Sequence, residues 1–280
     1  MATGSPLTGL ALAASSVADD LGYVAMSDLA KALGDLAADY RVIGGHMVTM
    51  LAARWQLGAG LYRETGDLDL GVPPIVAREK GVVRRIKDAS YLQVAGNRFA
   101  RRMGDIPAGM RGGRDSPSPE AVIDVLIPAY TSRARQNVQV GEDLFTTEVP
   151  GLHLALARPA VSLALTLRRL NGQTLDCELP FADEVSALVL KSLATKVRFK
   201  DTDIADTWRC LEIAFAAGLR PPDFAGSTRF DAAETVRSLF RDRNGQAMQV
   251  LAREQHLSGA VADERHTRIR ALIATVLGSA

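Results

Sequence analysis

The spacing of apolar residues divides the chain into a mixed N-terminal part and a helical C-terminal part. Helical spacing over residues 26–40, with Ser27 as the expected N-cap, is followed by short apolar runs typical of strands. These runs lie at residues 41–43, 67–72, 90–96 and 121–128. From about residue 180 helical spacing dominates, in segments at residues 183–199, 202–218, 231–256 and 259–278.

This order predicts an α+β fold, with a mixed sheet flanked by helices over residues 1–180 and a helical bundle over residues 181–280. Residues 5–16 are mildly apolar but lack a basic start, so we expect a loose terminus or docking arm, and neither a signal peptide nor a membrane span. Residues 98–119 are rich in Gly, Pro and Arg and are expected to form a long loop.

Composition narrows the class of protein. Of 280 residues, 47% are hydrophobic and 23% are charged, which is typical of a globular protein in water. The formal net charge is only +1, so contact with nucleic acid would need a local basic patch. Cys177 and Cys210 are the only cysteines, which excludes a disulfide framework and a cysteine-only zinc site and favours the cytoplasm; Cys210 is expected in the core.

Three carboxylates stand on predicted strands. Asp67 and Asp69 would point to one face of their strand, where they repel each other unless a cation lies between them. Mg²⁺ suits this position, because it binds through one or two carboxylates together with substrate phosphates. Asp124 lies in the middle of an apolar strand and could complete such a site or pair with an arginine. A solvated strand edge, or a turn whose aspartates bond their own backbone, is the alternative for Asp67 and Asp69.

A glycine pair precedes the second predicted helix. Gly44 and Gly45 would let the backbone approach a ligand, and the helix N-terminus behind them offers N–H groups to phosphate. A tight strand-to-helix connection is the alternative. His46 could contact phosphate or pack at the helix start. Together with the carboxylates, the glycine pair is the equipment of metal-assisted phosphoryl chemistry.

The segments VIGGHMVTMLAARW, RETGDLDLGV and VIDVLIP resemble the core of the DNA polymerase β-like nucleotidyltransferase superfamily. Within it they are most similar to the AbiEii group (MenT-like) of bacterial toxin nucleotidyltransferases. That group has a Gly-Gly or Gly-Ser turn, an Arg-x-Thr/Ser-x-Asp-x-Asp strand and a third strand carboxylate. Arg63, Thr65, Asp67 and Asp69 match the strand, and Asp124 matches the third carboxylate. His46 departs from the Gly-Ser form, so the serine contact to phosphate is missing.

The segment ALVLKSLATKVRFKDTDIADTWRCL resembles a second element of the group, a helix with an inward lysine followed by an aspartate in the next helix. The resemblance implies that Lys191 stabilises triphosphate charge and that Asp206 orients Lys191 or the nucleotide. Two alternatives stay open. Lys191 could lie on a solvated face, and Asp206 could be the N3 partner of Asp203 as helix N-cap.

Arginines outnumber acids in the predicted loop, where Asp105 is the single acid between positions 98 and 114. The arginines are Arg98, Arg101, Arg102, Arg111 and Arg114. They would contact RNA backbone or triphosphate if the loop lies beside the site. A solvated loop is the alternative.

The resemblance implies a nucleotidyltransferase that moves a nucleoside monophosphate from an NTP to an acceptor and releases pyrophosphate. Mg²⁺ would be the cofactor, with Mn²⁺ as a substitute. Asp67 and Asp69 would hold the metal, while Arg63 and Lys191 would offset phosphate charge. The expected acceptor is RNA, at the 3′ end of tRNA, and the expected partner is an antitoxin. A small-molecule acceptor such as an antibiotic, a protein acceptor and an inactive binding protein stay open as alternatives.

Overall fold

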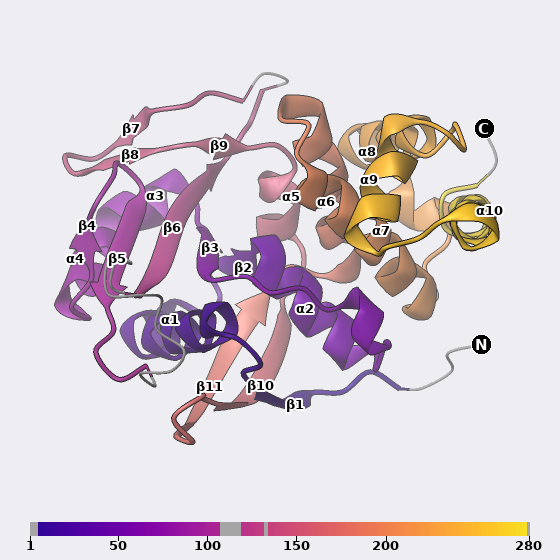
Figure 1. Cartoon of the computed structure of the whole chain (residues 1–280). Helices are drawn as coiled ribbons and strands as arrows, with labels where there is room; N and C mark the ends of the chain where they lie inside the picture. Colours follow the sequence, from indigo (N-terminus) through magenta and orange to yellow (C-terminus); the bar gives the residue numbers. More distant parts are fainter. Residues whose placement is uncertain (1–4, 107–118, 132–133, 279–280) are drawn as a thin grey trace. The chain divides into compact units, whose positions relative to one another are not determined.

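The computed structural model describes residues 5–106, 119–131 and 134–278 (Figure 1). The chain divides into two compact units. A sheet unit contains Leu7–Met47 and Arg63–Ala182, and a helical unit contains Val48–Tyr62 and the chain from Asp183 onward. One boundary falls between Met47 and Val48, inside helix α2 (Gly44–Arg54).

The sheet unit is built on a mixed, nine-stranded sheet. Its strands run in the order β1-β10-β11-β2-β3-β6-β5-β4, and β9 pairs with β6. Their bounds are β1 Gly9–Ala13, β2 Arg41–Ile43, β3 Asp67–Gly71, β4 Leu92–Gln93, β5 Arg98–Arg102, β6 Glu120–Pro128, β9 Glu148–Val149, β10 Val161–Arg168 and β11 Thr174–Phe181. A separate hairpin is formed by β7 (Val138–Val140) and β8 (Leu144–Thr146).

Helix α1 (Val17–Leu33) packs against β3, β6 and β11, and Leu68 and Leu70 of β3 are fully buried. Burial of these alternating leucines fixes which face of β3 is core, because a shift by one residue would bury the aspartates instead. The other helices of the unit are short: α3 Pro74–Glu79, α4 Val82–Asp88, α5 Leu152–Ala157 and the 3-10 turn η1 Gly34–Leu36.

The helical unit centres on α7 (Asp201–Ala216), which packs against α6, α9 and α10. The remaining elements are η2 Ala59–Leu61, α6 Glu184–Val197, η4 Pro221–Phe224, α8 Ser227–Leu239, α9 Gln246–Glu254 and α10 Gly259–Val276. Cys210 is fully buried, as expected. The predicted fold class is therefore confirmed: a mixed sheet flanked by helices, followed along the chain by helices α6 to α10. Within the described ranges, no helix is both long and apolar enough to cross a membrane.

Two N-terminal expectations were wrong. Ser27 is not a cap but a buried residue inside α1, which begins at Val17. The N-cap is Ser16, whose hydroxyl accepts from the Asp19 N–H at 3.2 Å, with acids in the first turn. The stretch expected to be a loose arm contains β1, which pairs in parallel with β10 from Gly9 to Ala13. Its partner lies about 150 positions away in sequence, so local periodicity could not reveal it.

The predicted long loop was wrong for its first five residues, which form β5 between β4 and β6. The rest of that segment falls mostly at positions 107–118, outside the described residues. In the helical part, the segment predicted as one helix over 231–256 is interrupted at residues 240–245, between α8 and α9. Asp242, Asn244 and Gly245 lie in this interruption and favour a turn.

A buried ion pair ties α1 to the hairpin of β10 and β11. Arg169, which follows β10, donates to Asp20 of α1 at 2.7 Å and 3.2 Å, and Asp20 also accepts the Leu170 N–H at 2.8 Å. The side chains of Arg169 and Asp20 are only 3% and 1% exposed. Arg169 also pairs with Asp105, whose side chain is 46% exposed. These carboxylates raise the pKa of Arg169 against the opposing effect of burial.

We expect Asp20→Ala to lower the free energy of unfolding by about 3–5 kcal/mol, because it leaves a buried guanidinium without its buried counter-ion. Asp105→Ala is the matched control and should lower it by about 1 kcal/mol or less, since Asp105 is half exposed. Urea unfolding at pH 7 measures both values. Equal losses would show that the buried Asp20 contributes no more to the free energy of unfolding than the half-exposed Asp105 does.

Candidate functional site

The register of the central strands brings the predicted carboxylates to one place. In the parallel pair of β3 and β6, Asp69 lies opposite Asp124. Asp67 is two residues before Asp69 and therefore on the same face of β3. The side chain of Asp124 is 15% exposed and that of Asp67 is 49% exposed, so the cluster opens to solvent on the Asp67 side.

A guanidinium lies between two of these carboxylates. Arg98 of β5 stands opposite Asp124 in the antiparallel register of β5 and β6. Its Nη2 donates to Asp67 Oδ2 at 2.6 Å and its Nη1 to Asp124 Oδ2 at 3.3 Å. Arg98 was expected in a loop that contacts RNA backbone or triphosphate, because nothing in the sequence gives the register of β5 on β6.

Burial and neighbouring charges act on the carboxyl group of Asp124. Its pKa is raised to about 6, first by burial and further by the charges of Asp69 and Asp67. The Arg98 guanidinium acts in the opposite direction.

The glycine pair packs directly on the motif strand and the residues before it. Gly44 has a φ of +73°, and a Cβ built there would lie 1.8 Å from Asp69 Oδ2. At Gly45 a Cβ would lie 2.6 Å from Arg63 Nη2 and 2.8 Å from Thr65 Oγ1. Any larger residue would displace these side chains. The glycines, Arg63, Thr65 and Asp69 are therefore brought together, as the sequence analysis expected.

His46 follows the glycines but is buried, with 2% of its surface exposed. Its ring packs on Gly22 of α1, where an added Cβ would lie 2.3 Å from Cε1 and Nε2. Burial lowers the pKa of His46 to about 4, so the imidazole is neutral at physiological pH. Packing at the helix start, one of the two expectations for this residue, describes its position in the structure.

Lys191 and Asp206 belong to the helical unit and form a buried pair there. Lys191 Nζ lies 2.8 Å from Asp206 Oδ2, with side-chain exposures of 8% and 0%. Arg209 donates to the other oxygen, Oδ1, at 3.1 Å. The solvated face considered for Lys191 is thus contradicted. The capping alternative is wrong as well, since α7 begins at Asp201 and Asp206 lies inside it; Asp203 accepts from Arg198 at 2.9 Å. Their contact with nucleotide stays a prediction.

The other arginines of the predicted basic loop have separate positions. Arg101 pairs with Asp28 at 2.8 Å, and Arg102, which is 82% exposed, pairs with Glu120 at 3.4 Å. Arg111 and Arg114 lie outside the described residues. RNA contact by these arginines stays a prediction.

The donor set fits a hard divalent cation in chemistry and charge. Across the described residues, no group of three or more His, Cys, Asp or Glu side chains is arranged as a metal site. Mg²⁺ needs fewer protein ligands, because one or two carboxylates suffice when phosphates supply the rest. Asp67 and Asp124 already share one cationic group, the guanidinium of Arg98. These two residues, with Asp69 beside them, are the ones that would hold the ion.

Comparison with known proteins adds one distant likeness. No family model matches the chain, and no curated protein matches it. A solved structure that does match is the crystal structure of an antigenic nucleotidyltransferase-like protein from Paracoccidioides brasiliensis. It is 15% identical, covers 79% of this chain and 88% of that chain, and gives a TM-score of 0.42. At this level of similarity the comparison assigns no role to any residue.

The buried ring of His46 predicts a loss of stability in acid. Its pKa is about 4 in the folded chain and about 6.5 when unfolded, so the unfolded chain binds more protons between these values. The free energy of unfolding should therefore fall by about 3 kcal/mol from this residue as the pH drops from 7 to 4. In urea unfolding at both pH values, His46→Gln should lose about 3 kcal/mol less than the wild type. His256→Gln, at an exposed histidine, is the matched control. Identical losses in wild type and His46→Gln would contradict the prediction.

Proposed function

We propose that this protein is a divalent-cation-dependent nucleotidyltransferase, which moves a nucleoside monophosphate from an NTP to an acceptor hydroxyl and releases pyrophosphate. The observation that carries the proposal is the contact of Gly44 with Asp69 while Asp69 lies opposite Asp124. The glycine turn leaves backbone N–H groups accessible to phosphate. Because the turn packs on the strand that carries Asp69, these groups lie next to carboxylates that suit a divalent cation. Phosphoryl transfer from a triphosphate needs both parts together.

Each group has a distinct task in this proposal. Asp67, Asp69 and Asp124 would hold Mg²⁺ or Mn²⁺, which would supply neutralisation of phosphate charge. Asp124 would alternatively accept the proton of the acceptor hydroxyl. Gly44 and Gly45 leave room for the phosphates, and the Arg63 guanidinium, which packs on Gly45, offsets their charge. The resemblance to the AbiEii group supports a further role for Lys191, which would offset triphosphate charge, and for its ion-pair partner Asp206, which would orient it.

The finer part of the proposal concerns the acceptor. We propose RNA, at the 3′ end of tRNA, and the role of a toxin held in check by an antitoxin. Support comes from the match of Arg63, Thr65, Asp67 and Asp69 to the Arg-x-Thr-x-Asp-x-Asp strand of the AbiEii group. The arginine excess between positions 98 and 114 is consistent with an RNA acceptor.

Transfer of label tests the catalytic proposal. The protein is incubated with Mg²⁺, total RNA and each of the four NTPs labelled on the α-phosphate, and labelled RNA is measured. Asp69→Asn should reduce the rate by at least about 100-fold, because it removes a charge that would face the cation. Asp176→Asn, on β11 with its carboxylate bonded to Thr166, is the matched control and should keep the wild-type rate. Equal labelling by wild type and Asp69→Asn would refute the role of the cluster.

Salt dependence tests the choice of RNA. An RNA acceptor held through its phosphates should be labelled at a rate that falls steeply between 50 and 200 mM salt, with a slope of about −0.7 per phosphate contact on a logarithmic plot. Arg111→Gln combined with Arg114→Gln should make the slope shallower. Label found only on an added aminoglycoside or protein would replace RNA as the acceptor. Mg²⁺-dependent stabilisation by NTP without release of pyrophosphate would instead identify a binding protein.

A further inference from the structure

Arg98 occupies the oxygens that a cation in this site would need. Its guanidinium bonds Oδ2 of Asp67 and Oδ2 of Asp124, which belong to different strands. We infer that Arg98 is a built-in counter-ion that competes with the divalent cation for Asp67 and Asp124, so that the cation binds only as the guanidinium moves away. This inference rests on the proposed function, because it concerns the cation site of that function.

Charge makes the two occupants mutually exclusive. A guanidinium and a divalent ion on the same pair of oxygens would lie only a few ångströms apart and repel each other strongly. Either alone offsets the negative charge of Asp67 and Asp124, the two carboxylates to which the guanidinium donates. The cluster therefore exchanges one positive group for another and is not left without a counter-ion.

The surroundings of Arg98 permit this exchange. Its side chain is 40% exposed and that of Asp67 is 49% exposed, so the guanidinium can move into water without becoming a buried unpaired charge. Arg169 gives the contrast within the same unit, since it is 3% exposed and enclosed by Asp20 and Asp105. The backbone ladder of β5 and β6 is independent of the Arg98 side chain, so the strand stays in register when the guanidinium leaves.

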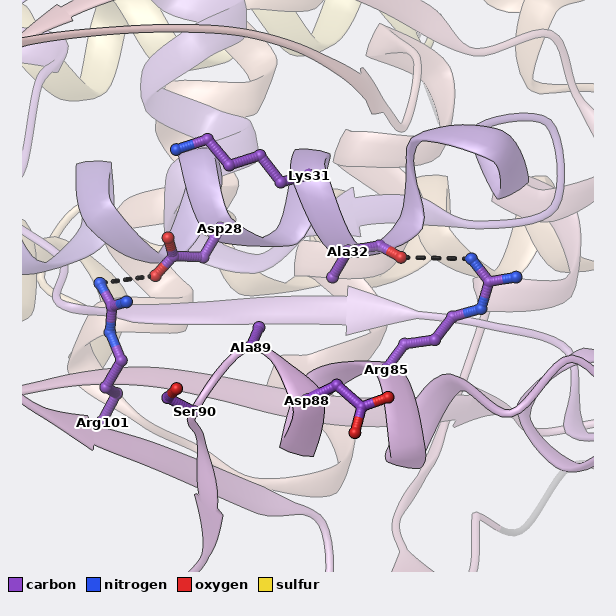
Figure 2. Close-up of a pocket in the computed structure, with 8 residues that line it drawn as sticks. All are labelled: Asp28, Lys31, Ala32, Arg85, Asp88, Ala89, Ser90 and Arg101. Atoms are coloured by element: carbon purple, nitrogen blue, oxygen red, sulfur yellow. Dashed lines mark hydrogen bonds and ion pairs between the residues drawn. The ribbon is translucent and has the colours of Figure 1, made fainter.

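The same strand supplies two matched controls. Arg101 points to the opposite face of β5, because it is an odd number of residues from Arg98. Figure 2 shows it paired with Asp28. Both residues line a surface cavity of about 490 Å³, together with Lys31 and Arg85. Arg102 shares the face of Arg98 but pairs with Glu120 and is 82% exposed. Arg101→Gln and Arg102→Gln thus remove one positive charge from β5 without freeing Asp67 or Asp124.

Titration of the nucleotide-free protein with Mn²⁺ by calorimetry tests the inference. Arg98→Gln should bind Mn²⁺ about fivefold more tightly than the wild type, since the ion no longer displaces an ion pair. Arg101→Gln and Arg102→Gln should stay within about twofold of the wild type. Binding to Arg98→Gln that is equal to the wild type, weaker or undetectable would overturn the inference. So would an equal gain in Arg102→Gln, which would reveal a general effect of charge.

Thermal unfolding gives a second readout that a purely structural arginine would not produce. Without metal, Arg98→Gln should melt below the wild type, because Asp67 and Asp124 then lose the guanidinium that lies between them. Saturating Mn²⁺ should raise the Tm of Arg98→Gln more than that of the wild type. If Arg98→Gln does not fold, Arg98→Lys replaces it in the same titration. A lysine ammonium cannot bridge Asp67 Oδ2 and Asp124 Oδ2 as the forked guanidinium does, so Arg98→Lys should also bind Mn²⁺ more tightly than the wild type. Wild type and Arg98→Lys with equal affinity would overturn the inference. The proposed function is tested by a different experiment: it fails if wild type and Asp69→Asn label RNA equally, whatever the Mn²⁺ affinity of the Arg98 variants.

Discussion

The parallel register of β3 and β6 is the constraint on which the site depends. It sets Asp69 opposite Asp124, with Asp67 on the same face, and so concentrates negative charge on one patch of the sheet. Burial of Leu68 and Leu70 on the other face of β3 prevents relief by a shift of register, because such a shift would bury the aspartates. The chain therefore keeps three carboxylates close together on one face of the sheet, with the Arg98 guanidinium between two of them.

Other features of the sheet unit follow from this concentration of charge. Arg98 approaches from β5 because the antiparallel register of β5 and β6 points its side chain to the same face as Asp124. The turn at Gly44 must have no side chain, since Asp69 fills the space that a Cβ would take. His46, next along α2, is buried and neutral, so it adds no further positive charge beside the cluster. Each position is thus restricted by the carboxylates next to it.

The sequence was sufficient where the signal is local. Strand β2, the glycine turn, the alternation of Asp67 and Asp69 with leucines, and helices α6, α7 and α10 follow from spacing within about fifteen residues. It was insufficient where the partner is distant. Nothing near Gly9 indicates Ala164, and nothing near Arg98 indicates Asp124. Strand β10 was overlooked, although buried and exposed residues alternate along it from Val161 to Arg168. This period of two is the local signal of a strand.

Strand β1 gives the first residues of the described chain a part in folding. It stands at the end of the sheet order and pairs only with β10, in parallel, so it covers the backbone edge that β10 would otherwise expose. Unpaired edges of this kind recruit strands from other molecules. Removing residues 9–13 would move the edge of the sheet from the five residues of β1 to the eight residues of β10. A longer edge gives strands of other molecules more backbone to pair with, while every residue of the carboxylate cluster is still present.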